Sequence, residues 1–245
     1  MEEPKFNLSR RRFITTSALA TAGLAFTPVS ELMAMAKKPD SNFGGVQIGA
    51  ITYSWRQMPS TAQDILKYCQ EAGLSSIELM GDVAEGFAGL PKNREEQKAW
   101  RLSVSMDKYK ELKKMFSKAG VKIPIVKFAP ARWSDEEIDY AFKAAKALGA
   151  KGITEEIGED ACKKLGKFAE KHGMYAIYHN HMQPGDPNFS FEKFLAYSPA
   201  NRLNFDAGHY YGATGKHPNE IVEKLHDRIF SIHLKDKTSK TATPP

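Results

Sequence analysis

Histidine and carboxylate side chains stand at the ends of three apolar segments in the second half of the chain. His179 and His181 end the first segment, Asp206 ends the second, and His233 lies near the end of the third. Imidazole and carboxylate groups that adjoin buried residues need water, a partner or a cation. Mixed nitrogen and oxygen ligands suit Mn²⁺, Zn²⁺, Co²⁺ or Fe²⁺ and fit Mg²⁺ less well. The pattern therefore predicts a divalent-metal site that uses His179, Asp206 and His233.

Two acidic side chains, Glu155 and Glu156, end a fourth apolar segment. Because side chains alternate along a strand, only one of these two can point toward the metal site. That glutamate would add a carboxylate to the site. For any single histidine the alternative is a hydrogen-bonded group of the core or the surface. The succession of three strand ends favours the metal site over that alternative.

The elements that must position these side chains follow a repeated pattern of helix, glycine and strand. In each repeat a helical pattern ends at a glycine that can adopt the left-handed conformation, and an apolar segment follows. The glycines are Gly73, Gly120, Gly149 and Gly173. Such repeats indicate successive βα units and a parallel sheet. Helix starts are predicted at Ser60–Gln63 and at the capping box Ser134–Glu137, among others.

The apolar segments predict seven strands, near residues 46–52, 75–80, 122–128, 150–156, 174–179, 202–206 and 229–235. A right-handed progression of βα units closes at eight strands. We find no eighth strand in the ten residues after Lys235. We therefore predict an α/β fold, a (β/α)8 TIM-type barrel that is truncated at its C-terminal end, over residues 37–245.

The first 36 residues are predicted to be a signal peptide. Ser9–Ile14 contains a twin-arginine pattern, an apolar stretch extends from Thr15 to Phe26, and Ala34–Ala36 is a small-x-small cleavage site. The apolar stretch is too short to be a good membrane span. We expect export through the twin-arginine (Tat) pathway, cleavage after Ala36, and a periplasmic or otherwise exported domain without a membrane span.

Composition narrows the classes of function. The 245 residues are 42% hydrophobic and 26% charged, which is typical of one globular domain. The net charge of +6 is spread along the chain, whereas a nucleic-acid site would be clustered. Cys69 and Cys162 form no CxxC motif, which argues against a thiolate zinc site or a redox pair. No dinucleotide-binding, P-loop or nucleophile-elbow motif is found.

The segments that carry these side chains resemble motifs of the xylose-isomerase-like TIM barrels, a superfamily often called sugar phosphate isomerases/epimerases. The resemblance covers most of residues 46–236, and the Asp-x-x-His pattern of Asp206 and His209 is its more specific element. The segments concerned are Thr52–Trp55, Ser76–Leu79, Ile177–His181, Asn204–His209 and Ser231–Asp236.

The resemblance implies a divalent metal, commonly manganese, at the mouth of the barrel. Asp206 matches the family's aspartate ligand and His233 its histidine ligand. His179 stands where many members carry a glutamate ligand, and Glu156 is the carboxylate that would compensate. The family's last glutamate ligand belongs to strand eight.

The resemblance also implies an activity. The metal would withdraw charge from a carbonyl and stabilise an enediolate, while Glu156 or His181 accepts the proton. Residues expected to contact substrate are Tyr53, Trp55, Glu78, His209 and Lys235. The expected enzyme is a sugar isomerase or epimerase, or a related keto-sugar lyase or dehydratase.

Two other classes of function remain open. A non-catalytic carbohydrate-binding relic would explain an incomplete barrel. An apurinic-site endonuclease shares the barrel, but it needs several metals and a basic DNA-binding face. We expect a small carbohydrate as the partner, without a phosphate group because of the predicted export, and no nucleic acid. Assembly into a homo-oligomer is left open.

Overall fold

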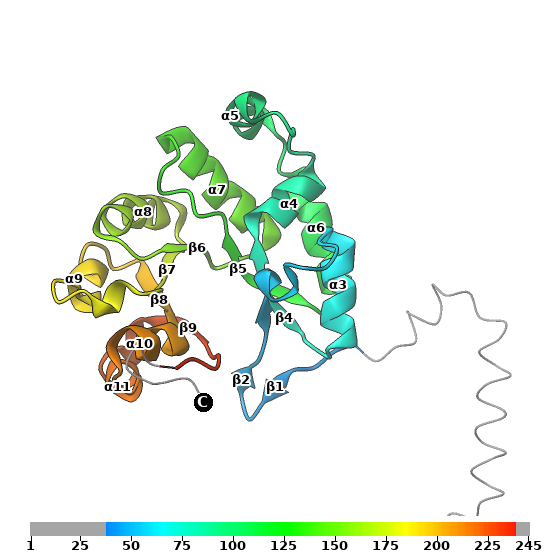
Figure 1. Ribbon diagram of the computed structural model, residues 1–245. Helices are drawn as coiled ribbons and strands as arrows, with labels where there is room; N and C mark the ends of the chain where they lie inside the picture. The colour runs from blue at the N-terminus through cyan, green and yellow to red at the C-terminus, as the bar shows by residue number, and fades with distance from the viewer. Residues whose placement is uncertain (1–37, 239–245) are drawn as a thin grey trace, which may run out of the picture. The chain divides into compact units, whose positions relative to one another are not determined.

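The fold is a curled parallel sheet of seven strands with helices along its outer side (Figure 1). The computed structural model describes residues 38–238. The strands of the sheet follow one another in chain order, and each pairs in parallel with the next. They are β3 (Ala50–Ile51), β4 (Ser76–Met80), β5 (Lys122–Lys127), β6 (Gly152–Glu156), β7 (Tyr175–His179), β8 (Asn201–Asp206) and β9 (Ile229–His233). All carboxyl ends therefore lie at one rim.

Helices connect these strands. The longer ones are α3 (Ala62–Glu71), α4 (Gly81–Ala88), α5 (Arg94–Ser103), α6 (Asp107–Lys118), α7 (Asp135–Leu148), α8 (Glu159–His172) and α10 (Ala207–Thr214). Shorter ones are α9 (Phe191–Leu195), α11 (Asn219–Leu225) and the 3-10 helices Thr52–Trp55, Gln183–Gly185 and His226–Arg228. Within residues 38–238, no helix has the length and apolar character needed to span a membrane.

The core lies between the sheet and its outer helices. Ile77 of β4, Val126 of β5 and Ile153 of β6 are fully buried, as are Phe116 of α6 and Phe142 of α7. Strands covered on both faces lack the alternation of apolar and polar residues that marks a half-exposed sheet. The predicted capping box Ser134–Glu137 is confirmed at the start of α7, and α3 begins within the predicted Ser60–Gln63 segment with a second capping box of Thr61 and Asp64.

The predicted fold class is confirmed, but the first predicted strand is wrong. Residues 46–52 divide between a hairpin, β1 (Asn42–Phe43) with β2 (Val46–Gln47), and the short β3. Gly44 and Gly45 take positive φ angles of 57° and 87°, which favours a tight hairpin turn. The other six strands lie within two residues of their predicted bounds. The twin-arginine pattern and the cleavage site fall outside the described residues.

Arg101 makes the polar contacts of helix α5 with the barrel, while Trp100 packs edge-to-face on Tyr140 of α7 with ring centroids 6.2 Å apart. Arg101 donates two hydrogen bonds to Glu85 of α4, at 2.7 and 3.2 Å, and one to Glu137 of α7 at 3.2 Å. Its guanidinium also lies 3.9 Å from the centre of the Trp133 ring. No residue of α5 is fully buried. Arg101 therefore provides the polar attachment of a helix that the sequence analysis missed.

Asp139 of α7 should make stability depend on acid pH. Its carboxylate lies 2.7 Å from Lys143 Nζ, 2.6 Å from Lys171 Nζ and 2.7 Å from His172 Nε2. Burial alone would raise the pKa of Asp139, but these hydrogen bonds hold it well below its usual range. The unfolded chain then binds more protons than the folded one near pH 3–4, so this contribution is present above the unfolded pKa and lost below it.

We expect Asp139→Asn to lower the free energy of unfolding at pH 7 by about 1 kcal/mol, since both lysines are exposed and screened. The difference from the unsubstituted protein should shrink as the pH falls from 5 toward 2. Urea unfolding at several pH values measures this. Asp160→Asn, on the exposed start of α8, is the control. A difference in unfolding free energy between Asp139→Asn and the unsubstituted protein that stays constant with pH would contradict the role given to Asp139.

Candidate metal centre

The three predicted metal ligands meet at the rim of the sheet. His179 ends β7, Asp206 ends β8 and His233 ends β9. His179 Nε2 lies 3.2 Å from Asp206 Oδ2, and His233 Nδ1 lies 3.8 Å from the same oxygen. One ligand atom from each residue falls within 4.8 Å of the other two. The predicted convergence of these three strand ends is confirmed.

Asp206 is the buried centre of the cluster, with no exposed surface. Its Oδ1 accepts the His209 backbone N–H at 2.7 Å and so caps α10. Its Oδ2 faces His179, His233 and Lys235 Nζ, the last at 2.5 Å. Burial opposes ionisation, but those three nitrogen-bearing side chains hold the pKa of Asp206 well below its usual range. The carboxylate is therefore charged at neutral pH.

Glu78 positions the His233 ring. Its Oε2 lies 2.8 Å from His233 Nε2, which turns Nδ1 toward Asp206. Thr154 and Asn204 also donate to Glu78, both at 2.9 Å. Burial lowers the pKa of His233, but the two carboxylates outweigh it and raise that pKa to about 9. Glu78, which we expected to contact substrate, is thus placed behind a metal-ligand candidate and is only 7% exposed.

Glu156 supports His179 in the same way. Its Oε2 lies 3.2 Å from His179 Nδ1 and 3.3 Å from His181 Nε2, and its Oε1 lies 2.5 Å from Lys127 Nζ. Burial would raise the pKa of Glu156, but His179 and Lys127 lower it to about 2. Such a carboxylate is a weak proton acceptor. As expected, its neighbour Glu155 turns away and accepts backbone N–H groups.

His181 and His209 extend the cluster toward the open side. Their rings stack with centroids 4.6 Å apart. Burial lowers the pKa of both imidazoles, so both are neutral at pH 7. The His209 Nδ1 atom is buried and has no hydrogen-bond partner among the described residues. The His181 side chain is 51% exposed and is therefore accessible to a substrate or to a proton.

The two predicted aromatic contacts lie on the first 3-10 helix, after β3. Tyr53 is 57% exposed, and Arg56 lies 5.0 Å from its ring centre. Trp55 packs on Tyr68 of α3 with centroids 5.7 Å apart. Their contact with a sugar ring stays a prediction.

Two buried asparagines, Asn180 just after β7 and Asn204 within β8, hold the ligand candidates in place, a role that was not predicted. Asn180 donates to the Asp206 carbonyl at 3.0 Å and accepts the Asp206 N–H at 2.9 Å. Asn204 accepts a hydrogen bond from Ser231 at 2.7 Å while it donates to Glu78. The available signal was an asparagine in or directly after an apolar strand, which needs a buried partner.

The donor set fits a divalent transition metal. One carboxylate oxygen and two imidazole nitrogens face one another, and each imidazole has a carboxylate on its other nitrogen. A carboxylate on the far nitrogen fixes the tautomer and the orientation of a metal-binding histidine. His179, Asp206 and His233 are thus the residues that would hold the ion.

Comparisons with known proteins agree with this fold. No family model matches the chain. The inosose dehydratase of Clostridium beijerinckii is 36% identical over 80 residues, which are 31% of this chain and 26% of that enzyme. The match therefore spans about a quarter of that relative's length.

Two solved structures cover most of the chain. A sugar phosphate isomerase/epimerase from Parabacteroides distasonis aligns over 80% of both chains, with a TM-score of 0.57 and 20% identity. A probable 3-DHS dehydratase from Bacillus anthracis covers 79% of this chain and 74% of its own, with a TM-score of 0.59 and 17% identity. At these identities, the structures establish the fold alone.

Proposed function

We propose that this protein is a divalent-metal-dependent enzyme that isomerises, epimerises or dehydrates a sugar or a related polyhydroxylated ketone. The observation that carries the proposal is the meeting of His179, Asp206 and His233 at three adjacent strand ends. The short match to an inosose dehydratase supports the same kind of chemistry, as do the two fold neighbours, a sugar phosphate isomerase/epimerase and a probable 3-DHS dehydratase.

A divalent cation at this site would act as a Lewis acid that polarises a substrate carbonyl. His181 is our choice of proton acceptor, because it is neutral at pH 7 and lies beside the ligand cluster. Glu156 orients His179 instead, since it is ion-paired with Lys127 and has a lowered pKa.

One proton abstraction serves all the proposed reactions. Removal of the proton next to a carbonyl gives an enediolate or enolate. Return of the proton to another carbon or face gives isomerisation or epimerisation, and loss of a β-hydroxyl gives dehydration. With export through the twin-arginine pathway, which we also propose, the substrate would be an unphosphorylated keto-sugar or keto-cyclitol.

Metal analysis and hydrogen exchange test the proposal together. We expect about one Mn, Zn, Co or Fe ion per purified chain. In D2O the metal-loaded protein should exchange the proton next to the carbonyl of inosose or of ketohexoses, and EDTA should stop the exchange. His181→Gln should keep the metal and lose at least about 100-fold in exchange rate.

Other outcomes separate the alternatives. Sugar binding without exchange in the metal-loaded protein would indicate a carbohydrate-binding relic. Salt-sensitive binding and cleavage of abasic DNA would indicate an endonuclease. Either result would contradict the proposed activity.

A further inference from the structure

The ammonium group of Lys235 lies at the oxygen that a metal ion would need. Lys235 is two residues beyond β9, and its Nζ lies 2.5 Å from Asp206 Oδ2. His179 Nε2 and His233 Nδ1 point to the same oxygen. The other oxygen, Oδ1, is engaged as the cap of α10. Asp206 therefore offers one oxygen to any cation, and Lys235 already contacts it.

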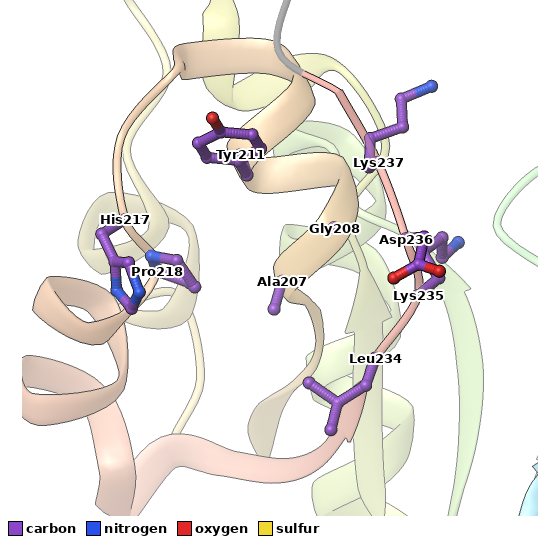
Figure 2. A pocket seen from close by; sticks show the side chains of 9 residues that line it. All are labelled: Ala207, Gly208, Tyr211, His217, Pro218, Leu234, Lys235, Asp236 and Lys237. Carbon is purple, nitrogen blue, oxygen red and sulfur yellow. The ribbon is translucent and has the colours of Figure 1, made fainter. Parts of the chain in front are cut away.

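The path of the Lys235 side chain depends on Gly208, in the first turn of α10. A Cβ atom at Gly208 would lie 2.6 Å from Lys235 Cγ and 2.9 Å from its carbonyl oxygen. A backbone atom is one of the two contacts, so a flexible side chain alone could not relieve the clash. Figure 2 shows the segment of Leu234 to Lys237 running alongside Gly208. The close packing of helix and segment brings the ammonium to Asp206.

Lys235 also has room to leave Asp206. Its side chain is 39% exposed and borders an open groove of about 550 Å³ (Figure 2). An ammonium that left Asp206 could move into this groove, which Asp236 and Lys237 also line. It would remain available to a ligand at the rim.

We infer that Lys235 is an exchangeable counter-ion, which a divalent cation displaces from Asp206 and which then binds a negatively charged oxygen of the substrate. This inference rests on the proposed function. Two cations at one carboxylate oxygen repel each other strongly in a buried site, so one must move. After the exchange, Lys235 adds its positive charge to that of the cation. The site then favours a substrate whose oxygen is anionic, as in an enediolate or a carboxylate.

Metal and ligand affinities of Lys235→Met provide the test. Without its competitor, the metal-stripped variant should bind Mn²⁺ about tenfold more tightly than the unsubstituted protein. The metal-saturated variant should bind a sugar hydroxamate, an anionic mimic of the enediolate, at least about tenfold more weakly. Isothermal titration calorimetry at one pH measures both affinities.

Two further variants control for charge. Lys237→Met removes the same charge from the same groove, and we expect it to change either affinity by less than about threefold because exposed charges are screened. Lys235→Arg keeps the charge, so it should bind Mn²⁺ more weakly than Lys235→Met does.

The outcomes separate this inference from the proposed function. If Lys235→Met binds Mn²⁺ no more tightly than the unsubstituted protein, the inference is wrong, although binding that depends on Asp206 would still support the metal centre. If hydroxamate affinity is unchanged, Lys235 does not bind the anionic oxygen. If neither protein binds a divalent metal, both the inference and the proposed function fail.

Discussion

Replacing Asp206 with asparagine should weaken divalent-metal binding by at least about 100-fold. The substitution removes the charged oxygen to which His179 and His233 both point, and an amide oxygen is a poorer ligand for a transition metal. Asparagine is also a good N-cap, so α10 should still begin at residue 207. The loss should therefore reflect the charge rather than unfolding. Calorimetric titration with Mn²⁺ and Zn²⁺, beside circular dichroism, measures both properties.

Asp160→Asn is the matched control for this experiment. It makes the same chemical change at an exposed position in the first turn of α8. Its metal affinity should equal that of the unsubstituted protein. Undiminished affinity in Asp206→Asn, with the helical signal unchanged, would reject the ligand assignment.

Replacing Arg101 with methionine should lower the free energy of unfolding by about 3–5 kcal/mol. The side chains of Arg101, Glu85 and Glu137 are only 11%, 6% and 9% exposed. Removal of the guanidinium leaves two buried carboxylates without their cation, which is far more costly than the loss of an exposed ion pair. It also removes the contact with the Trp133 ring. Chemical denaturation at pH 7 measures the change.

A surface lysine provides the comparison. Lys108 pairs with Glu111 at 2.8 Å, but both side chains are 55% exposed. Lys108→Met should therefore change the free energy of unfolding by less than about 0.5 kcal/mol. If Arg101→Met and Lys108→Met lower the free energy of unfolding by the same amount, the buried network contributes no more than a surface ion pair. That result would also remove the reason for treating Arg101 as the attachment of α5.

Local patterns were sufficient to predict the strand ends that form the candidate metal centre. His179, Asp206 and His233 each follow a run of apolar residues, and parallel strands bring such ends to one rim. The alternation of side chains along β6 also predicted that only one of Glu155 and Glu156 would face the cluster, and Glu156 is the one that does. These predictions needed only the period of a strand and the direction of its chain.

Interactions between distant residues could not be predicted in this way. Glu78 is 155 residues from His233, and no local pattern indicates that their side chains meet. The pairing of Lys127 with Glu156 likewise depends on how β5 and β6 align. The strand predicted at 46–52 failed because the hairpin turn at Gly44 and Gly45 competes with a continuous strand. Helix α10 was missed because Asp206 both ends β8 and caps the helix.

The position of β9 has a consequence for how the protein would respond to a metal ion. Among the described residues β9 pairs with β8 alone, and Ile232 and Leu234 are 43% and 83% exposed. A strand with one neighbour separates from a sheet more readily than an interior strand. An ion bound by His179, Asp206 and His233 would link β9 to β7 and β8, the two strands that precede it. Binding of the ion would therefore stabilise the pairing of β9 with β8, and separation of β9 would weaken ion binding.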